Sequence, residues 1–300
     1  ERYDLMEQAY GNDYRNENPG ATDTDVRNYL GTVMPDKQQA LANNTDWIKA
    51  GYRTGQIQRY NLSVSGGAQK FKYYAGGTYH HELPVAFTDQ YDKYQLRVNT
   101  EYAPSSKFTI TTGFNGSFTK SRSAGLSNYQ SNLYGMMPWD NPRRPDGSYK
   151  TGGPNEAGWY SGSSTYNPLY DAAWQYGFDK TYLASGDTKL QYNITPWLSV
   201  SSANRITLGF GKFGFYTDPR DSASYRPGGF YLQQASTRIN YITSNMLSFN
   251  KRIGQHAIKG LAGMEFNDIR NELTSVAVRD ITPGSTSIAS GKVDRTGEDI

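Results

Sequence analysis

The stretch RYNLSVSGGAQKFKYYAGGTYHH, residues 59 to 81, alternates apolar and polar side chains, stops once at a Gly-Gly, and then alternates again. Because successive side chains of a strand point to opposite faces, each arm divides into an apolar and a polar side. In the first arm the apolar side holds Tyr60, Leu62 and Val64, and the polar side holds Asn61, Ser63 and Ser65. The segment GGAQ, residues 66 to 69, predicts the tight hairpin turn between the arms, with glycine supplying a positive φ.

Composition limits what this hairpin can belong to. The 300 residues include 25 Tyr, 12 Phe and 5 Trp, which excludes a disordered chain, yet the mean hydropathy is −0.75. No apolar run approaches the roughly 20 residues that a membrane helix needs. The absence of cysteine excludes disulfides and thiolate metal sites. A net charge of +3, with scattered Lys and Arg, gives no basis for a nucleic-acid partner.

The alternating pattern occurs about eight times along the chain. We expect strands near residues 56–65, 70–80, 92–102, 107–118, 181–193, 197–209, 237–250 and 256–270. Short links near residues 66–69, 103–106, 195–197 and 252–255 alternate with long ones at 81–91, 119–180 and 210–236. Short and long connections therefore fall at opposite ends of the predicted sheet.

This asymmetry is typical of an outer-membrane barrel, which has tight periplasmic turns and long extracellular loops. We therefore expect an all-β fold, an antiparallel up-and-down transmembrane β-barrel. The Leu62 side would face lipid, the Ser63 side a hydrated lumen, and Tyr60, Tyr102 and Trp197 the interfacial girdles. A soluble β-sandwich gives the same alternation if the apolar face is a core, so that alternative stays open. A small closed barrel needs no loop as long as 119–180, so the eight strands would be part of a larger barrel.

Three motifs could indicate chemistry, and each has a simpler interpretation. GFGKFG, residues 209 to 214, matches a dinucleotide fingerprint but is followed by no helix. His80 and His81 are adjacent on a strand, point opposite ways and predict no metal site. Asp218 and Asp221 could form a hydrolytic carboxylate pair, but we interpret them as solvated acids in a turn. The sequence predicts no catalytic residues, no metal, no cofactor and therefore no enzyme.

The 119–180 loop is the candidate site for ligand contact. It combines aromatic residues with acids, amides and arginines, a mixture that stacks on sugar faces and hydrogen-bonds hydroxyl groups. The candidate residues are Trp139, Asp140, Asn141, Arg143, Arg144, Trp159, Tyr160 and Tyr166. The alternative is that these side chains pack the loop on itself or against a partner protein.

Several segments resemble one family. NTDWIKAGYRTGQIQRYNLSVSGGAQKFKYYAGGTY and the following YDKYQLRVNTEYAPSSKFTITTGFNGSF are similar to the SusC/RagA family of TonB-dependent transporters. NPLYDAAW, residues 167 to 174, and ITPWLSV, residues 194 to 200, are similar as well, so that the resemblance runs from about residue 45 to 270.

The resemblance implies more than these residues contain. Such transporters have a barrel of about 22 strands, a plug domain, a TonB-interacting segment and a SusD-like lid lipoprotein. Residues 1–55 show neither a plug nor a TonB segment. With candidate helices at 22–30 and 35–44, they suit a polar, partly helical extracellular excursion ahead of a barrel segment at 56–300. We therefore expect the middle of a longer protein.

The predicted function is uptake of a glycan or oligopeptide across the outer membrane of a Gram-negative, Bacteroidota-like bacterium. The partners implied by the resemblance are the lid lipoprotein, the TonB-ExbB-ExbD energising complex and the membrane lipid. The alternative is a secreted, aromatic-rich β-protein that binds or cleaves glycans.

Overall fold

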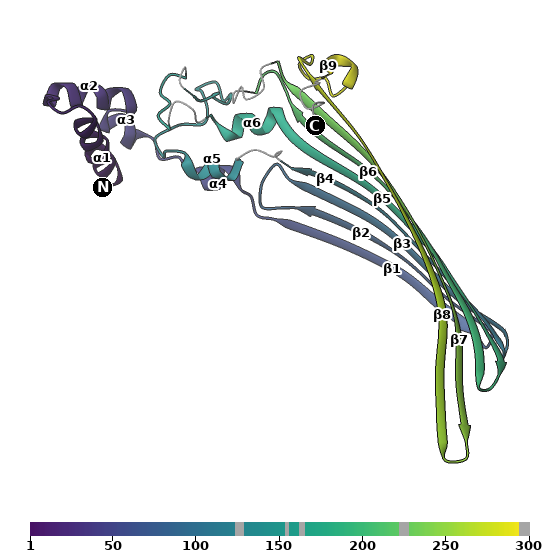
Figure 1. Ribbon diagram of the computed structural model, residues 1–300. Coiled ribbons are helices and arrows are strands. Elements are labelled where there is room, and N and C mark those ends of the chain that lie inside the picture. Colours follow the sequence, from purple (N-terminus) through teal and green to yellow (C-terminus); the bar gives the residue numbers. More distant parts are fainter. Residues whose placement is uncertain (124–128, 154–155, 162–165, 222–227, 294–300) are drawn as a thin grey trace.

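The computed structural model is one antiparallel sheet with helices and loops gathered at one end (Figure 1). It describes residues 1–123, 129–153, 156–161, 166–221 and 228–293. Nine strands follow one another in chain order, each paired with the next, and the sheet is open. The all-β, up-and-down arrangement predicted from the alternating pattern is confirmed, as a partial barrel.

The strands are β1 (Gln56–Ala68), β2 (Phe71–Leu83), β3 (Gln90–Ser105), β4 (Phe108–Ser123), β5 (Gln175–Thr195), β6 (Leu198–Thr217), β7 (Phe230–Ile253), β8 (His256–Arg279) and β9 (Lys292–Val293). The helices are α1 (Arg2–Glu17), α2 (Asp23–Val33), α3 (Lys37–Ala42), α4 (Trp47–Gly51), α5 (Tyr129–Gly135), α6 (Pro168–Trp174) and the 3-10 turn η1 (Ile288–Ser290). Within the described ranges, no helix is both long and apolar enough to cross a membrane.

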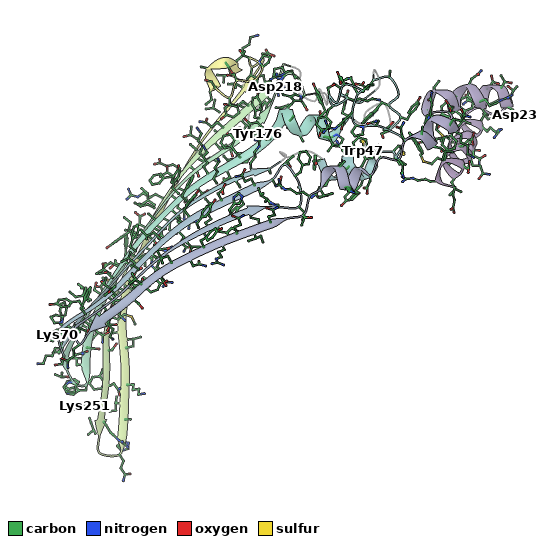
Figure 2. All side chains as sticks on the ribbon, turned by 180° about the vertical axis from the view of Figure 1, so that it is seen from behind. Asp23, Trp47, Lys70, Tyr176, Asp218 and Lys251 are labelled. Atoms are coloured by element: carbon green, nitrogen blue, oxygen red, sulfur yellow. The ribbon has the colours of Figure 1, made fainter. Side chains whose placement is uncertain are left out.

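Short and long connections lie at opposite ends, as expected. Lys70 and Lys251 mark the end with the hairpin turns, and Asp218 and Tyr176 mark the other end (Figure 2). All eight long strands exceed their predicted lengths, and much of the added length lies toward the loop end. The long connections therefore shrink to 84–89, 124–174 and 218–229.

The predicted position of the first turn is wrong. Gly66 and Gly67 lie inside β1, opposite Tyr73 and Lys72, and neither has a positive φ; the chain reverses at residues 69 and 70 instead. The Tyr73 ring explains the glycine, because a Cβ on Gly66 would lie 2.8 Å from the Tyr73 hydroxyl oxygen. Glycine here makes room for an aromatic ring rather than bending the backbone.

The two faces of the sheet differ as predicted. Paired residues share a face, and Leu62 is opposite Gly77, which is opposite Leu96. On the same face one cross-strand row is almost wholly aromatic: Tyr60, Tyr79, Tyr94, Phe118, Tyr182 and Phe210. Stacked rings link the first five of these side chains, with centroids 4.6 to 6.3 Å apart. Leu62 is 82% exposed, so this face has no covering layer.

The apolar surface crosses the strands obliquely. The row that begins at Tyr60 in β1 ends at Glu272 in β8, whereas the last apolar outward side chain before the charged segment of β8 is Phe266. The intervening outward residues, Asp268 and Arg270, are charged and form an ion pair. A band that descends from strand to strand is what a bilayer requires of tilted barrel strands.

Some polar side chains also point outward, and they bond to one another. Thr100 and Thr112 hydroxyl oxygens lie 2.7 Å apart, and Tyr241 donates to Asn204 at 3.3 Å. Asn204 in turn donates to Ser202 at 3.1 Å. Such mutual hydrogen bonds lower the cost of placing these groups in an apolar surrounding.

The first three helices form a cluster beyond the loop end of the sheet (Figure 1). A capping box starts α2, in which Thr22 accepts from the Asp25 amide and Asp25 accepts from the Thr22 amide. Asp36 caps α3 by accepting from the amides of Gln38 and Gln39. These two helices match the candidate segments 22–30 and 35–44, and α1 is an additional helix.

Candidate functional site

The connection from β4 to β5 folds into a compact unit, here called the loop cap (residues 129–174 as described). Trp47 of α4 anchors it, donating its indole N–H to the Met137 carbonyl at 2.8 Å. The Thr45 amide donates to the Pro138 carbonyl at 2.7 Å. Two apolar clusters hold the cap together. One is built around Trp47, Tyr129, Leu133, Met136, Trp159 and Leu169, and the other around Met34, Ala40 and Trp139.

Both candidate tryptophans lie in these interiors. Trp139 is 5% exposed and packs edge-on against Tyr3 of α1, with ring centroids 5.9 Å apart. Trp159 is 8% exposed and meets Trp47 in the same geometry at 5.8 Å. In this conformation neither ring offers a free face for stacking on a ligand, and each instead joins the cap to the N-terminal helices.

Asp140 organises the segment between the tryptophans. Its carboxylate is fully buried and accepts from the Tyr160 amide at 2.8 Å and from the Ser161 hydroxyl. Burial raises the pKa of Asp140, although the hydrogen bonds from Ser161 and Tyr160 oppose that shift. The side chain therefore ties residues 140 and 160–161 together across the cap.

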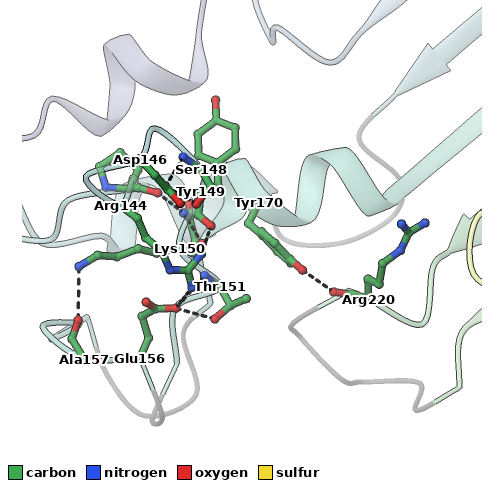
Figure 3. Close-up of polar contacts among 12 residues, drawn as sticks. Arg144, Asp146, Ser148, Tyr149, Lys150, Thr151, Glu156, Ala157, Tyr170 and Arg220 are labelled. Atoms are coloured by element: carbon green, nitrogen blue, oxygen red, sulfur yellow. Dashed lines mark hydrogen bonds and ion pairs between the residues drawn. The ribbon is translucent and has the colours of Figure 1, made fainter.

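Arg143 and Arg144 brace the turn that follows. Arg143 donates to the Gly147 carbonyl and to the Tyr149 hydroxyl, both at 2.7 Å, and its guanidinium lies 4.0 Å from the centre of the Tyr149 ring. Arg144 pairs with Glu156 at 2.7 Å (Figure 3). Burial raises the pKa of Glu156, but hydrogen bonds from Thr151 and the charge of Arg144 outweigh it and hold that pKa low.

The structure thus brings the eight candidate residues into one unit, in which they differ in their exposure to solvent. Trp139, Asp140 and Trp159 are buried, whereas Asn141 and Arg143 are exposed and Arg144, Tyr160 and Tyr166 are half-buried. Ligand contact through the accessible members stays a prediction.

Two further polar residues hold the cap together and were not among the candidates from the sequence. Asn167 is fully buried, and its amide nitrogen donates to the carbonyls of Pro142 and Lys150 at 3.0 and 2.8 Å. Glu156 accepts from the Thr151 amide and hydroxyl. The N-P dipeptide at 167 and 168 carries a signal for the first, because Asn is a preferred helix N-cap and Pro a preferred first helical residue.

The interpretation of Asp218 and Asp221 as solvated acids is wrong. Asp218 is 1% exposed and accepts from the Tyr216 hydroxyl at 2.6 Å and from the Gly284 amide at 2.7 Å. It also accepts from the Nε and Nη2 atoms of Arg220 at 2.7 and 2.9 Å. Burial raises its pKa, but these donors outweigh burial and hold the pKa well below its usual range. Asp218 is thus a structural anchor between β6 and the chain after β8.

Asp221 lies in a different environment. It is 8% exposed, and burial, followed by the nearby charge of Asp171, raises its pKa to about 8. The raised pKa favours the neutral, protonated form of this buried carboxyl group near neutral pH. Tyr170 crosses the same junction by donating to the Arg220 carbonyl at 3.0 Å (Figure 3).

The inward face of the sheet is polar and carries charges of both signs. Arg205 approaches Asp187 at 3.8 Å, and Gln95 donates to Asn115 at 3.1 Å. A shallow hollow on this face is lined by these four residues together with Arg97. Such a surface suits a water-filled lumen and gives a solute polar groups to bind.

The remaining motifs have structural roles in the described residues. GFGKFG lies inside β6, so no helix N-terminus follows it. His81 bonds to Asp92 at 2.7 Å and His80 to Glu82 at 3.3 Å, each near the loop end of the first strands. No group of three or more His, Cys, Asp or Glu residues in the described ranges is arranged to hold a metal ion.

Comparison with known proteins agrees with the fold and the motifs, although no family model matches. The chain is 22% identical over 262 residues to TonB-dependent receptor P3 of Formosa agariphila and 24% identical over 255 residues to receptor P26 of that organism. Each alignment covers 81% of this chain, which spans about a quarter of the length of those relatives, 25% and 24%.

Solved structures with the same fold include the RagAB peptide transporter, at a TM-score of 0.73 and 16% identity, over 97% of this chain and 34% of that one. The open-open state of the RagAB peptide importer gives 0.70 and 17%, over 96% and 31%. Sequence and fold therefore agree, and the similarity of this chain to the SusC/RagA family of TonB-dependent transporters is confirmed.

Proposed function

We propose that this chain forms part of the wall and of the extracellular loops of an outer-membrane transporter that imports a glycan or an oligopeptide. The observation that carries the proposal is the inequality of the two sheet faces. One face exposes a continuous apolar and aromatic surface, and the other exposes Arg97, Asp187 and Arg205. A soluble glycan-binding protein would have to cover the first face, and within the described residues nothing does.

The proposed cargo site is the accessible part of the loop cap, and the proposed energy source is the TonB-ExbB-ExbD complex. Asn141 and Arg143 are exposed beside the half-buried Tyr160 and Tyr166, a set that offers hydrogen bonds and ring faces to a polar oligomer. The relatives are receptors and importers by name, and we accordingly assign no catalysis to this chain.

A lid lipoprotein is the proposed partner at the loop end. Leu5, Leu41 and Tyr134 are 61%, 73% and 67% exposed in the helical cluster and cap. Each of these side chains would bury apolar area against a partner that covered this end of the molecule.

Uptake in the native organism tests the proposal. A strain that lacks the gene should lose uptake of either an oligopeptide or a glycan pool, and loss of TonB should abolish the same uptake. Arg143→Gln should raise the substrate concentration for half-maximal uptake about tenfold, whereas the matched change Arg2→Gln on exposed α1 should not. Uptake that continues without TonB would contradict the proposal.

A further inference from the structure

Three lysines stand side by side on the lipid-facing surface, in strands that are remote in sequence. Lys120 of β4 is the register partner of Lys180 of β5, which is the partner of Lys212 of β6. Directly opposed side chains on one face have Cβ atoms about 5 Å apart, and like charges at that separation destabilise a sheet. In the described part of the chain, none of the three forms an ion pair.

One acid lies in this row, and its carboxylate already has three polar partners. Asp92 is the register partner of Lys120, but its carboxylate lies 2.7 Å from His81 and accepts from Gln90 at 3.0 Å and from Tyr79 at 3.3 Å. One row further toward the loops, Arg122 adds another cation and lies 4.3 Å from the centre of the Tyr176 ring. The surface therefore carries four cations, Lys120, Lys180, Lys212 and Arg122, against the one carboxylate of Asp92.

The position of the row indicates what supplies that charge. Each lysine is two residues from an aromatic member of the outward belt: Phe118, Tyr182 and Phe210. Aromatic belts lie at the membrane interface, and the lysines lie on the loop side of this one. At that height an outward cation meets the headgroups of the outer leaflet.

A groove on the other side of the belt matches a lipid chain. It is apolar and lies over β1 to β4, between the aromatic row and the strand centres. Gly77 and Gly116 form its floor, and Leu62 and Leu96 flank it. The space is open at Gly77, where an added Cβ would meet nothing closer than 3.9 Å, and the Phe114 ring borders it at Gly116, 3.2 Å from an added Cβ. On β4 the groove, the belt and the basic row follow at Gly116, Phe118 and Lys120.

We propose that this surface binds a phosphorylated glycolipid of the outer leaflet. Its phosphate would sit among Lys120, Lys180 and Lys212, and an acyl chain would run along the groove at Gly77 and Gly116. Phosphate is the group that neutralises a cluster of three ammonium groups at the interface. The inference rests on the proposed outer-membrane placement but not on the cargo, the lid or TonB.

The test measures phosphorylated glycolipid retained by the native protein after extraction from outer membranes into detergent. The triple variant Lys120→Gln, Lys180→Gln, Lys212→Gln should retain at least about tenfold less than the wild type. The matched control replaces three inward-facing lysines, Lys93, Lys189 and Lys259, with Gln and should retain the wild-type amount. Folding of each variant is checked by heat-modifiable migration, and Lys180→Gln alone serves if the triple variant does not fold.

Three further arms define the ligand. Gly77→Leu should fill the groove and reduce retention while leaving the lysines intact. Dephosphorylated glycolipid should not rebind to stripped protein, and excess inorganic phosphate should not displace the lipid. The proposal is overturned if the folded lysine variant retains the wild-type amount, or if phosphate-free glycolipid binds equally well. Displacement by inorganic phosphate alone would also overturn it. The amount of retained glycolipid depends on neither TonB nor substrate, so this test can succeed even if the uptake experiment fails.

Discussion

At the scale of the residue, a single position along a strand decides which solvent a side chain meets. Leu62 and Ser63 are adjacent, both exposed, and point to opposite faces. Val64→Arg, on the same face as Leu62 and further from the interfacial Tyr60, should impair barrel insertion by about 2 to 4 kcal/mol, whereas Ser63→Arg should be tolerated. The folded fraction across a urea titration in lipid vesicles measures both, and an equal cost at the two sites would refute the assignment of faces.

Because of Asp221, the stability of the loop end should depend on pH. Its pKa is raised to about 8, so between about pH 4 and 8 the folded junction binds more protons than the unfolded chain. The stability of the junction with Asp171 should therefore fall as pH rises through this window. Amide exchange at Asp221, which donates to the Asp218 carbonyl at 2.9 Å, reports the effect.

Asp221→Asn keeps the shape of the side chain and removes the titration. After correction for the intrinsic chemical rate, amide exchange in this variant should no longer become slower as the pH falls. A pH dependence that persists in this variant would assign the effect to another group.

At the scale of the element, close packing in the loop cap depends on one glycine. Gly51, the last residue of α4, is buried, and an added Cβ would collide with the Leu133 side chain of α5. Gly51→Val should therefore destabilise the cap by about 1 to 3 kcal/mol. Gly31→Ala is the opposite control, because Gly31 is inside α2 with open space around it, and alanine should stabilise that helix by about 1 kcal/mol.

Protease cleavage rates in the cap measure both glycine variants against the wild type. Faster cleavage for Gly51→Val and unchanged or slower cleavage for Gly31→Ala is the expected pair of results. If Gly51→Val cleaves at the wild-type rate, α4 and α5 are not packed as described.

The strands were predictable because alternation is written directly in their sequence, and the cap was not because its contacts join distant residues. YQLRVNTEY fixes the faces of β3 without any knowledge of its partners. Two donors to Asp218, Tyr216 and Arg220, are close in sequence, but nothing in TDPRDS reveals that Gly284 also encloses this carboxylate, so that turn was misjudged. The turn was misplaced for a related reason, since the glycines fit close neighbours across the ladder: the Tyr73 ring at Gly66 and the Phe71 carbonyl at Gly67.

At the scale of the whole molecule, the open sheet sets what an isolated segment can do. Among the residues that the structure describes, β1 has no partner on its outer side, and on the other edge only Val278 and Arg279 of β8 pair with β9. Unpaired strand edges cost several kcal/mol for each backbone group in a bilayer. Residues 1–300 expressed alone should therefore aggregate in detergent. A stable, protease-resistant barrel from this segment would contradict the expectation.

The central claim is that one face of the sheet meets lipid and the other meets water. Spin labels test it most directly when they are attached to single cysteines of the native protein in lipid vesicles. These 300 residues contain no cysteine, so each of residues 94 to 99 can be labelled in turn, with any cysteine elsewhere in the full-length protein replaced by serine. Relaxation by oxygen should peak at Leu96 and Val98, and relaxation by a water-soluble nickel complex at Gln95, Arg97 and Asn99. A profile without this period of two, or with water reaching Leu96 and Val98, would contradict the account.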